Sequence, residues 1–192
     1  MRTATPDDLD GLTETISLAF RDDPLWSWAF PDGSGMPAWW RFLLTSALRY
    51  PLVFVADDIA AVAVWIPPGG VELTDEEEAQ VEPLMHELVG ERTPSVMGLL
   101  DAFDASHPKD RPHYYLSLLG THPDSRGRGV GMGLLAETLT EIDREQMPAY
   151  LESSNKRNVP RYESAGFEIT GDFSTPDGSR TVDTMWREPA PV

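Results

Sequence analysis

An apolar stretch followed by a glycine-rich turn, LLGTHPDSRGRGVGMG at residues 118–133, most constrains how this chain can fold. Glycine occupies every second position from Gly127 to Gly133, and glycine permits backbone conformations and close approaches that a Cβ forbids. A helix that begins after such a turn presents free N–H groups and the positive end of its dipole. Arg126 and Arg128 add side chains suited to phosphate oxygens. The stretch therefore predicts a strand, a loop and a helix that together bind an anion.

Several classes of glycine-rich turn bind phosphate, and the residues around Gly131 separate them. A Walker loop requires Lys and then Ser or Thr after its last glycine, whereas Met132 and Gly133 stand here. A dinucleotide-binding turn lies near the start of a βαβ unit, with an acid about 20 residues further on. The R-x-x-G-x-G spacing of Arg126, Gly129 and Gly131 instead resembles the loop that binds the acyl-CoA pyrophosphate in GNAT acetyltransferases.

The composition suits one globular domain, residues 1–192, with a sizeable core. Of its residues 41% are hydrophobic and 24% are charged, which is ordinary for a soluble protein. The formal net charge of −17 argues against nucleic acid as a partner, because neutralising phosphate requires a basic face. It fits a cationic partner such as an amine, although an acidic surface kept for solubility explains it more simply.

Several kinds of chemistry and location are disfavoured by what the sequence lacks. Cysteine is absent, which excludes disulfides, thiolate metal sites and an acetyl-cysteine intermediate. The four histidines form no i,i+4 pair, so we expect no metal. No apolar run reaches membrane-spanning length, and the N-terminus has no signal-peptide pattern. We therefore expect a cytoplasmic protein without a membrane partner.

Periodicity and turn residues divide the chain into the elements of an α/β domain. A first helix begins at Thr5-Pro6 and breaks at Asp22-Asp23-Pro24. Further helices are predicted over 38–49, over 72–91 with an interruption near Pro83, over 95–103, from the glycine loop to Pro148, and over 158–165. Strands are predicted over 52–56, 59–66, 114–119, 149–153, 167–173 and 180–187. A right-handed crossover makes strands 114–119 and 149–153 parallel.

Residues 72–106 form a helical excursion between two strands. From Glu72 to Glu91 there are eight acids and no Lys or Arg, with apolar residues such as Val81 and Met85 at helical spacing. The pattern is typical of an amphipathic helix with a solvated acidic face. Because inserted elements often cover a pocket, a role as a lid is a further expectation.

An aromatic segment lies between the first two long helices. Its members are Trp26, Trp28, Phe30, Trp39 and Trp40. Each tryptophan is most simply a core residue, but several aromatics around a turn also suit the wall of a pocket for a flat acceptor. Both interpretations stay open from the sequence.

A second motif lies in ESSNKRNVPRYESAGF, residues 152–167. Its Asn155, Asn158 and Tyr162 precede Gly166-Phe167, and Asn155 lies 29 residues beyond Arg126. The glycine loop and the Y-x-x-x-G-F pattern at that separation resemble the GNAT superfamily of N-acetyltransferases. The segments VFVADDIAAVAVW, HPKDRP, PAYLESS and RNVPRYESAGF more specifically resemble puromycin N-acetyltransferase and its relatives, over roughly residues 53–189.

The resemblance implies the GNAT fold. We expect a mixed α/β (α+β) sheet of six to seven strands flanked by helices and splayed between the fourth and fifth strands. Residues 72–106 would be a helical insertion before the fourth strand. Residues 1–50 would form the acceptor side, and residues 113–187 the core that binds acetyl-CoA.

The resemblance also implies how acetyl-CoA is held. Leu119, Gly120 and Thr121 would offer backbone hydrogen bonds to the pantetheine arm in the gap between the splayed strands. The loop amides would take the pyrophosphate, from Arg126, Gly127, Arg128, Gly129, Val130 and Gly131. Asn158 would hold the cosubstrate or order the loop, although a helix N-cap explains this residue almost as well.

Acyl transfer to an amine requires a proton acceptor and a donor for the leaving group. An alkyl amine has a pKa of about 10, so a carboxylate, or water held by one, must remove its proton. Glu152 is the first candidate and Asp23 the second, each with a structural alternative, and Tyr115 with Ser117 is another relay. By the resemblance Tyr162 lies near the thioester sulfur and donates a proton to it, unless it is only a core residue. A splayed-strand N–H would stabilise the oxyanion.

These observations predict an acetyl-CoA-dependent N-acetyltransferase that acylates a primary amine of a small molecule, such as an antibiotic or a metabolite, directly in a ternary complex. A protein or peptide amine is the alternative acceptor. A non-catalytic acyl-CoA sensor is the alternative from another class, and it could dispense with Tyr162. A homodimer stays open.

Overall fold

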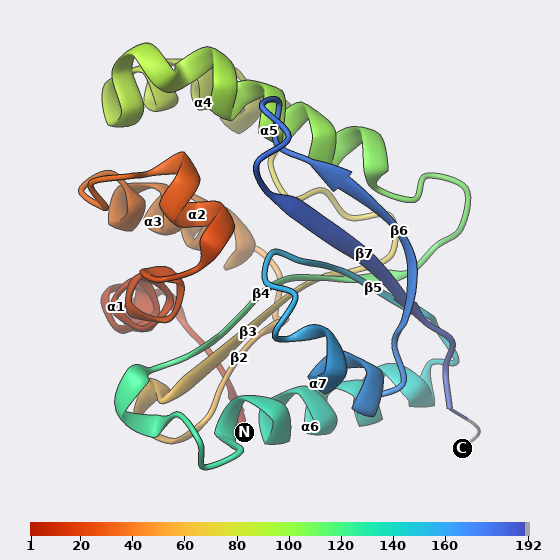
Figure 1. Ribbon diagram of the computed structural model, residues 1–192. Coiled ribbons are helices and arrows are strands. Elements are labelled where there is room, and N and C mark those ends of the chain that lie inside the picture. Colours follow the sequence, from red (N-terminus) through yellow and green to blue (C-terminus); the bar gives the residue numbers. More distant parts are fainter. Residues whose placement is uncertain (191–192) are drawn as a thin grey trace.

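A twisted sheet of seven strands runs through the computed structural model, which describes residues 1–190 (Figure 1). The strand order is β1-β2-β3-β4-β5-β7-β6. Every neighbouring pair is antiparallel except β4 and β5, which are parallel, so the predicted mixed sheet is confirmed. The strands are β1 (Arg2–Thr3), β2 (Val53–Val55), β3 (Ala61–Ile66), β4 (Tyr114–Thr121), β5 (Ala149–Ser153), β6 (Glu168–Ser174) and β7 (Thr181–Arg187).

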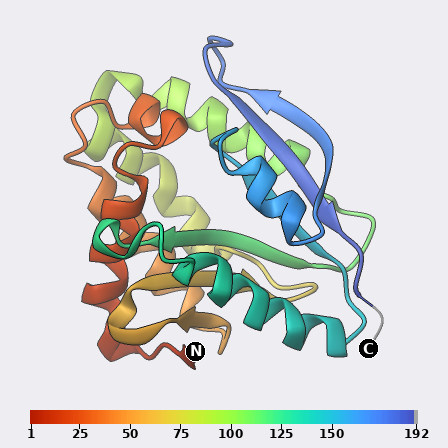
Figure 2. The ribbon, with the colours of Figure 1, turned by 60° about the horizontal axis from the view of Figure 1, so that its bottom comes forward.

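Helices cover both faces of this sheet. Helices α1 and α3 pack on one face, and α6 runs across the other, where Figure 2 shows it in teal. The α-helices of the described residues are α1 (Leu9–Phe20), α2 (Pro24–Ala29), α3 (Met36–Ala47), α4 (Asp75–Val89), α5 (Thr93–Ser106), α6 (Val130–Arg144) and α7 (Val159–Ser164). The short strand β1 and helix α2 were not predicted from the sequence.

Local capping sets where the inserted helix α4 begins. The Thr74 hydroxyl accepts a hydrogen bond from the Glu77 amide at 3.3 Å, and the Glu77 carboxylate accepts one from the Thr74 amide at 2.8 Å. This reciprocal capping box satisfies two amides that the first turn leaves free. The predicted interruption at Pro83 is wrong, because α4 continues through it. Pro83 and Ala79 are exposed, so water can replace the hydrogen bond that proline cannot donate.

Two hydrophobic clusters lie on opposite faces of the sheet because side chains alternate along its central strand. On β3, Val62 and Val64 join the cluster of the N-terminal helices, whereas Ala61, Ala63 and Trp65 join the cluster beneath α6. All of β3 is buried. The central strand therefore supports both layers and fixes the position of β4 beside it.

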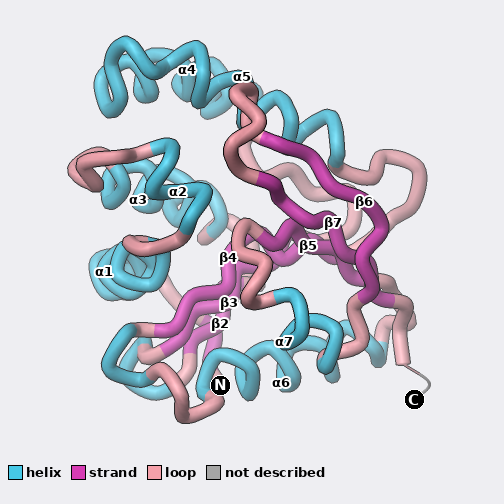
Figure 3. The backbone as a smooth tube through the Cα atoms, viewed as in Figure 1, coloured by secondary structure: helices cyan, strands magenta, loops and turns pink. Residues whose placement is uncertain are grey.

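The insertion of α4 and α5 precedes β4, as predicted. Helix α4 packs against α3, and α5 packs against β6. In Figure 3 these two helices lie at the top of the view, with α2 and α3 between them and α1, and near the tip of the β6–β7 hairpin. The insertion thus joins the N-terminal helices to the C-terminal hairpin above β4 and β5, where the predicted site residues lie.

Candidate active site

Strands β4 and β5 pair only at their beginnings. Tyr114–Leu116 pair with Ala149–Leu151, and the pairing stops there while β4 continues along β3 to Thr121. In the pairing with β3, Val64 is opposite Leu118 and Trp65 is opposite Leu116, so Ser117 is an extra residue. A bulge of this kind bends its strand and changes the direction of the groups that follow. The bulge at Ser117 therefore marks where the predicted splay opens.

The bulge also changes which backbone groups face the gap. Before it, the Tyr114 amide donates to Pro148 on the β5 side. After it, the His122 amide donates to the Ala60 carbonyl on the β3 side. In an antiparallel pair every second residue bonds to the same neighbouring strand, so Gly120 also faces β3, whereas Leu119 and Thr121 face away from it. Gly120 accordingly directs its amide and carbonyl to β3, which corrects its predicted backbone contact with the pantetheine arm. Leu119 and Thr121 present theirs to the gap, and their contacts with the pantetheine arm stay a prediction.

Gly120 has a different structural reason to be glycine. A Cβ at this position would lie 2.7 Å from Ile16 Cδ1 and 3.0 Å from Ala19 Cβ. The residue therefore lets helix α1 pack closely on β4. Its contribution to the site is indirect, since that packing brings the end of α1 to the glycine loop.

The glycine loop leaves a row of amides free. Gly127 and Gly129 both have φ of 75°, in the left-handed region that glycine adopts without strain. Within residues 1–190 no acceptor is hydrogen-bonded to the amides of residues 127–132. These amides converge at the N-terminus of α6, where the helix dipole favours negative charge. The geometry fits the predicted anion site.

Gly131 lies in a close contact that excludes a side chain. A Cβ there would be 2.2 Å from Thr121 Oγ1, far inside any ordinary contact distance. Gly133, in contrast, has no heavy atom within 4 Å of such a Cβ. The alternate glycines of the loop are therefore not equivalent, and Gly131 joins α6 to the end of β4.

The two loop arginines differ in what they contact. The Arg126 amide donates to Pro123 at 3.1 Å, and its guanidinium donates to Ala19 at 2.9 Å at the end of α1. The predicted phosphate contact through the Arg126 amide is therefore corrected, because that amide already closes a turn. Arg128 is exposed, and its side chain forms no hydrogen bond or ion pair with the part of the chain that the structure describes. Of the two loop arginines, Arg128 is the one whose guanidinium has no hydrogen bond to the described residues.

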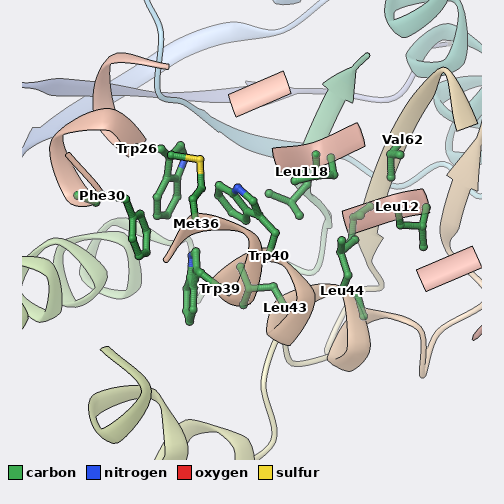
Figure 4. Close-up of a cluster of buried hydrophobic side chains, with 14 of the residues drawn as sticks. Leu12, Trp26, Phe30, Met36, Trp39, Trp40, Leu43, Leu44, Val62 and Leu118 are labelled. Atoms are coloured by element: carbon green, nitrogen blue, oxygen red, sulfur yellow. The ribbon is translucent and has the colours of Figure 1, made fainter. Parts of the chain in front are cut away.

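A cavity of about 770 Å³ opens where the splay begins. One wall is aromatic, and Figure 4 shows Trp26, Trp39 and Trp40 together there with Leu118 of β4. Trp39 and Trp40 are nearly fully buried, so these rings belong to the core and line the cavity at the same time. The interpretation of these tryptophans as core residues is therefore confirmed, and the contact of this wall with a flat acceptor stays a prediction. The predicted site residues that line the cavity are Leu119, Glu152, Asn158 and Tyr162, together with Tyr115 and Ser117 of the alternative relay.

Tyr162 and Asn158 come from the start of α7, at the end of the gap. The Tyr162 ring packs on Phe167 with centroids 6.2 Å apart. Burial, with a smaller contribution from Asp23, raises the pKa of Tyr162 to about 12, so its hydroxyl keeps its proton at neutral pH. Asn158 stands at the N-cap position but does not cap, since its side-chain oxygen accepts from Arg161 at 2.9 Å.

Glu152 projects from β5 just beyond the last pair with β4. Its side chain is only 3% exposed, and its Oε1 lies 3.8 Å from His107 Nδ1. Burial, and after it the charge of Glu152, raises the pKa of the Tyr115 and Tyr150 hydroxyls, and Tyr115 lines the same cavity as Glu152. Phenol and imidazole groups around a buried carboxylate can hold it in position and share its proton.

Asp23 occupies a different setting from Glu152. Its Oδ1 accepts from the Leu25 and Trp26 amides at 3.0 and 3.2 Å, and its Oδ2 accepts from the Ser154 hydroxyl at 2.8 Å. Burial raises the pKa of this carboxyl. Asp23 therefore caps α2 and fixes Ser154, and the arrangement favours Glu152 as the proton acceptor.

Sequence reasoning missed Glu72 and His107. Glu72 was placed on the solvated face of an amphipathic helix, but it precedes α4, lines the cavity and accepts a hydrogen bond from Ser117. His107 Nε2 lies 3.1 Å from His113 Nε2 and its ring lines the same cavity. The Pro-Pro-Gly-Gly turn before Glu72 and the Thr74-x-x-Glu77 capping-box pattern after it were the available signs that this acid lies outside the helix.

Two kinds of feature are absent from the described part of the chain. No group of three or more His, Asp or Glu side chains in residues 1–190 could hold a metal ion. None of the helices in that range has the length and apolar character that crossing a bilayer requires.

Comparison with known proteins identifies the family. The model of the GNAT acetyltransferase domain matches residues 78–187, more than half of the chain. The chain belongs to the GNAT acetyltransferase family. The family match confirms the superfamily resemblance but does not distinguish the puromycin enzymes from other GNAT members, so that finer resemblance stays a prediction.

Relatives of known name agree with this family. The chain is 39% identical over 62 residues to mycothiol acetyltransferase of Propionibacterium freudenreichii, which covers 31% of this chain and 20% of that protein. It is 26% identical over 165 residues to an uncharacterized N-acetyltransferase of Schizosaccharomyces pombe, which covers 80% of this chain and 66% of that protein. The chain thus spans less than two thirds of the length of either relative.

A solved structure shares the fold over nearly the whole chain. It is the Corynebacterium glutamicum protein described as histone acetyltransferase HPA2 and related acetyltransferase, with a TM-score of 0.69 and 22% identity. The match covers 99% of this chain and 96% of that one. The seven-stranded mixed sheet is therefore a GNAT fold.

GNAT acetyltransferases use acetyl-CoA, and the residues of this chain fit it. The free amides of residues 127–132 and the unpaired Arg128 suit a pyrophosphate. The gap-facing backbone groups of Leu119 and Thr121 suit an extended arm that carries amides of its own. The contact between Gly131 and Thr121 holds these two parts of the site together.

Proposed function

We propose that this GNAT protein is an acetyl-CoA-dependent N-acetyltransferase that acylates the primary amine of a small molecule, such as an antibiotic or a metabolite, in a ternary complex. The observation that carries the proposal is the cavity at the open end of the splay. It is lined by Leu119 of the gap, by Tyr162 and by Glu152, which are the groups that acyl transfer needs in one place.

Each of these groups has a role in the transfer. Acetyl-CoA supplies the acetyl group as a thioester. Glu152 accepts the first proton of the protonated amine, which frees the nitrogen lone pair to form the new C–N bond. The gap-facing amide of Leu119 donates to the carbonyl oxygen as negative charge develops on it.

Tyr162 acts on the leaving group. As the C–S bond breaks, its hydroxyl donates to the sulfur, and the second proton lost by nitrogen restores the phenol. The pKa of Tyr162, raised to about 12, keeps the donor protonated over the whole working range of pH. The products are the N-acetyl amine, the CoA thiol and one proton on Glu152.

The size of the cavity favours a small acceptor over a protein. Its lining comes from the N-terminal helices, from the segment after β3, from the end of α5 and from the gap between β4 and β5, and its volume is about 770 Å³. Volumes of this order are typical of small-molecule sites. A protein or peptide amine is the second candidate.

The test is CoA release from acetyl-CoA with a panel of primary amines, including puromycin, polyamines and short peptides. Amine-dependent release supports the proposal, and release with peptides alone selects the second candidate. Tyr162→Phe should lose turnover while its equilibrium binding of CoA is kept. Tyr114→Phe is the matched control, because the Tyr114 hydroxyl bonds Glu145 on the opposite face of the sheet. Binding of acetyl-CoA without release for any amine favours the sensor.

A further inference from the structure

Glu72 is held at the open end of the splay by two contacts. Its backbone carbonyl accepts from the Ser46 hydroxyl at 2.6 Å, which fixes the segment after β3 against α3. Its carboxylate accepts from Ser117, the extra residue of the β4 bulge. Glu72 therefore faces the cavity at the position where β4 and β5 separate, on the β4 side.

Glu152 faces the same position from β5. Leu116 pairs with Leu151, so Ser117, which donates to Glu72, and Glu152 are the next residues of two adjacent strands. Both carboxylates and the Tyr115 ring line the same cavity. Burial, and after it the charge of Glu152, raises the pKa of Glu72.

These carboxylates have no cationic side chain to balance them. In the described part of the chain, neither Glu72 nor Glu152 forms an ion pair with Lys or Arg. Two cations of the cavity wall are already paired, Lys109 with Asp104 at 3.0 Å and Arg111 with Glu188 at 2.8 Å. His107 lies 3.8 Å from Glu152, beyond hydrogen-bonding distance. An ionised buried carboxylate without a partner is costly, so these groups are stable either when protonated or when a cation lies beside them, and a cationic group of the ligand can supply that cation.

An acceptor with one amine cannot supply that charge throughout the reaction. Its nitrogen must become neutral before it attacks the thioester, and the proton goes to Glu152. Glu72 would then face the cavity with no cation. We infer that the acceptor carries a second cationic group, an ammonium or a guanidinium, and that Glu72 binds this group while Glu152 receives the proton of the reacting amine.

This inference rests on the proposed function, and it makes Glu72 a residue that determines specificity. It names the acceptor as a diamine or an amine with a guanidinium. The aromatic wall formed by Phe20, Trp26, Trp40 and Phe103 in the same cavity provides apolar contacts for the carbon chain of such a molecule.

The experiment compares straight-chain diamines of four to eight carbons with the monoamines in which a terminal methyl replaces the second ammonium. Each pair has the same number of heavy atoms and differs by one charge. The proteins are the wild type, Glu72→Gln, and the matched control Glu76→Gln, an exposed acid outside the cavity. Glutamine keeps an oxygen that can accept from Ser117. CoA release gives kcat and KM, and calorimetry gives the affinity for each amine without turnover.

We expect the wild type to prefer the diamine, and Glu72→Gln to lower that preference roughly 10- to 100-fold, through KM and binding affinity. Glu76→Gln should keep the preference, and unchanged CoA binding should show that Glu72→Gln is folded. Equal use of diamines and monoamines by the wild type overturns the inference while the proposed function stands. A Glu72→Gln variant that loses kcat equally for both kinds of amine also overturns it. Diamine binding that depends on Glu72 without CoA release refutes the proposed function and supports only the part of the inference that assigns Glu72 to a cationic group.

Discussion

The contact between Gly131 and Thr121 gives the sharpest test of the proposed pyrophosphate site. In Gly131→Ala the new methyl group would lie 2.2 Å from Thr121 Oγ1, whereas ordinary contacts begin at 3.4 Å. The start of α6 and the end of β4 must therefore separate by about 1 Å if the Thr121 side chain stays in place. The free amides of the loop move with α6.

The expected rise in KM for acetyl-CoA follows from that displacement. A misplacement of about 1 Å in a positioning contact can lower catalytic efficiency about 100-fold. We therefore expect KM for acetyl-CoA to rise about 10- to 100-fold. Gly133→Ala is the matched control, because its Cβ meets nothing within 4 Å. That variant should keep KM and gain up to about 1 kcal/mol in helix stability.

The assay is KM for acetyl-CoA together with direct calorimetric binding of CoA. The double variant Thr121→Ala with Gly131→Ala provides a rescue, because it removes the Oγ1 atom and leaves Thr121 Cβ at 3.6 Å. Binding of CoA should recover in the double variant. If Gly131→Ala and Gly133→Ala bind CoA equally well, the loop is not placed by this contact and the reasoning fails.

Other parts of the structure lead to three further predictions. Tyr162→Phe should lower kcat about 100-fold with little change in CoA binding, and an unchanged kcat at saturation would contradict its role. Glu152→Gln should lower kcat more than KM in steady-state assays, and Asp23→Asn should mainly lower the melting temperature. The Arg187 guanidinium donates to both carboxylate oxygens of Asp143 at 2.6 and 2.7 Å. Asp143→Asn should therefore lower the free energy of unfolding by about 3 kcal/mol, and Tm by about 6–12 °C.

The Asp143 pair also predicts how stability depends on pH. Arg187 holds the pKa of Asp143 below its usual value, so the pair stabilises the fold above the unfolded pKa. That contribution is lost as the pH falls below about 4 and through the folded pKa. Urea unfolding should therefore show the wild type and Asp143→Asn converging in acid. A constant difference between them would contradict this assignment.

Much of the site could be predicted from the sequence because its signals are local. Glycines at alternate positions determine the free amides of the loop, and Tyr162 follows from a short motif at fixed spacing. The interruption at Pro83 was mispredicted, because local propensity does not register that the unmade hydrogen bond lies on an exposed face. The contact of the Arg126 guanidinium with Ala19 was likewise invisible, because it joins residues 107 positions apart.

By itself the sequence determined the order and type of most helices and strands and the glycine-rich loop with its free amides, because hydrophobic periodicity and glycine geometry act over a few residues. Glu152 and Tyr162 were predicted through the resemblance to GNAT enzymes, and their roles stay predictions. Only the tertiary structure decided that β4 carries an extra residue at Ser117, that Gly120 faces β3, and that Glu72 meets Ser117 across 45 positions of sequence. Those features depend on register and on long-range packing, which no local pattern specifies.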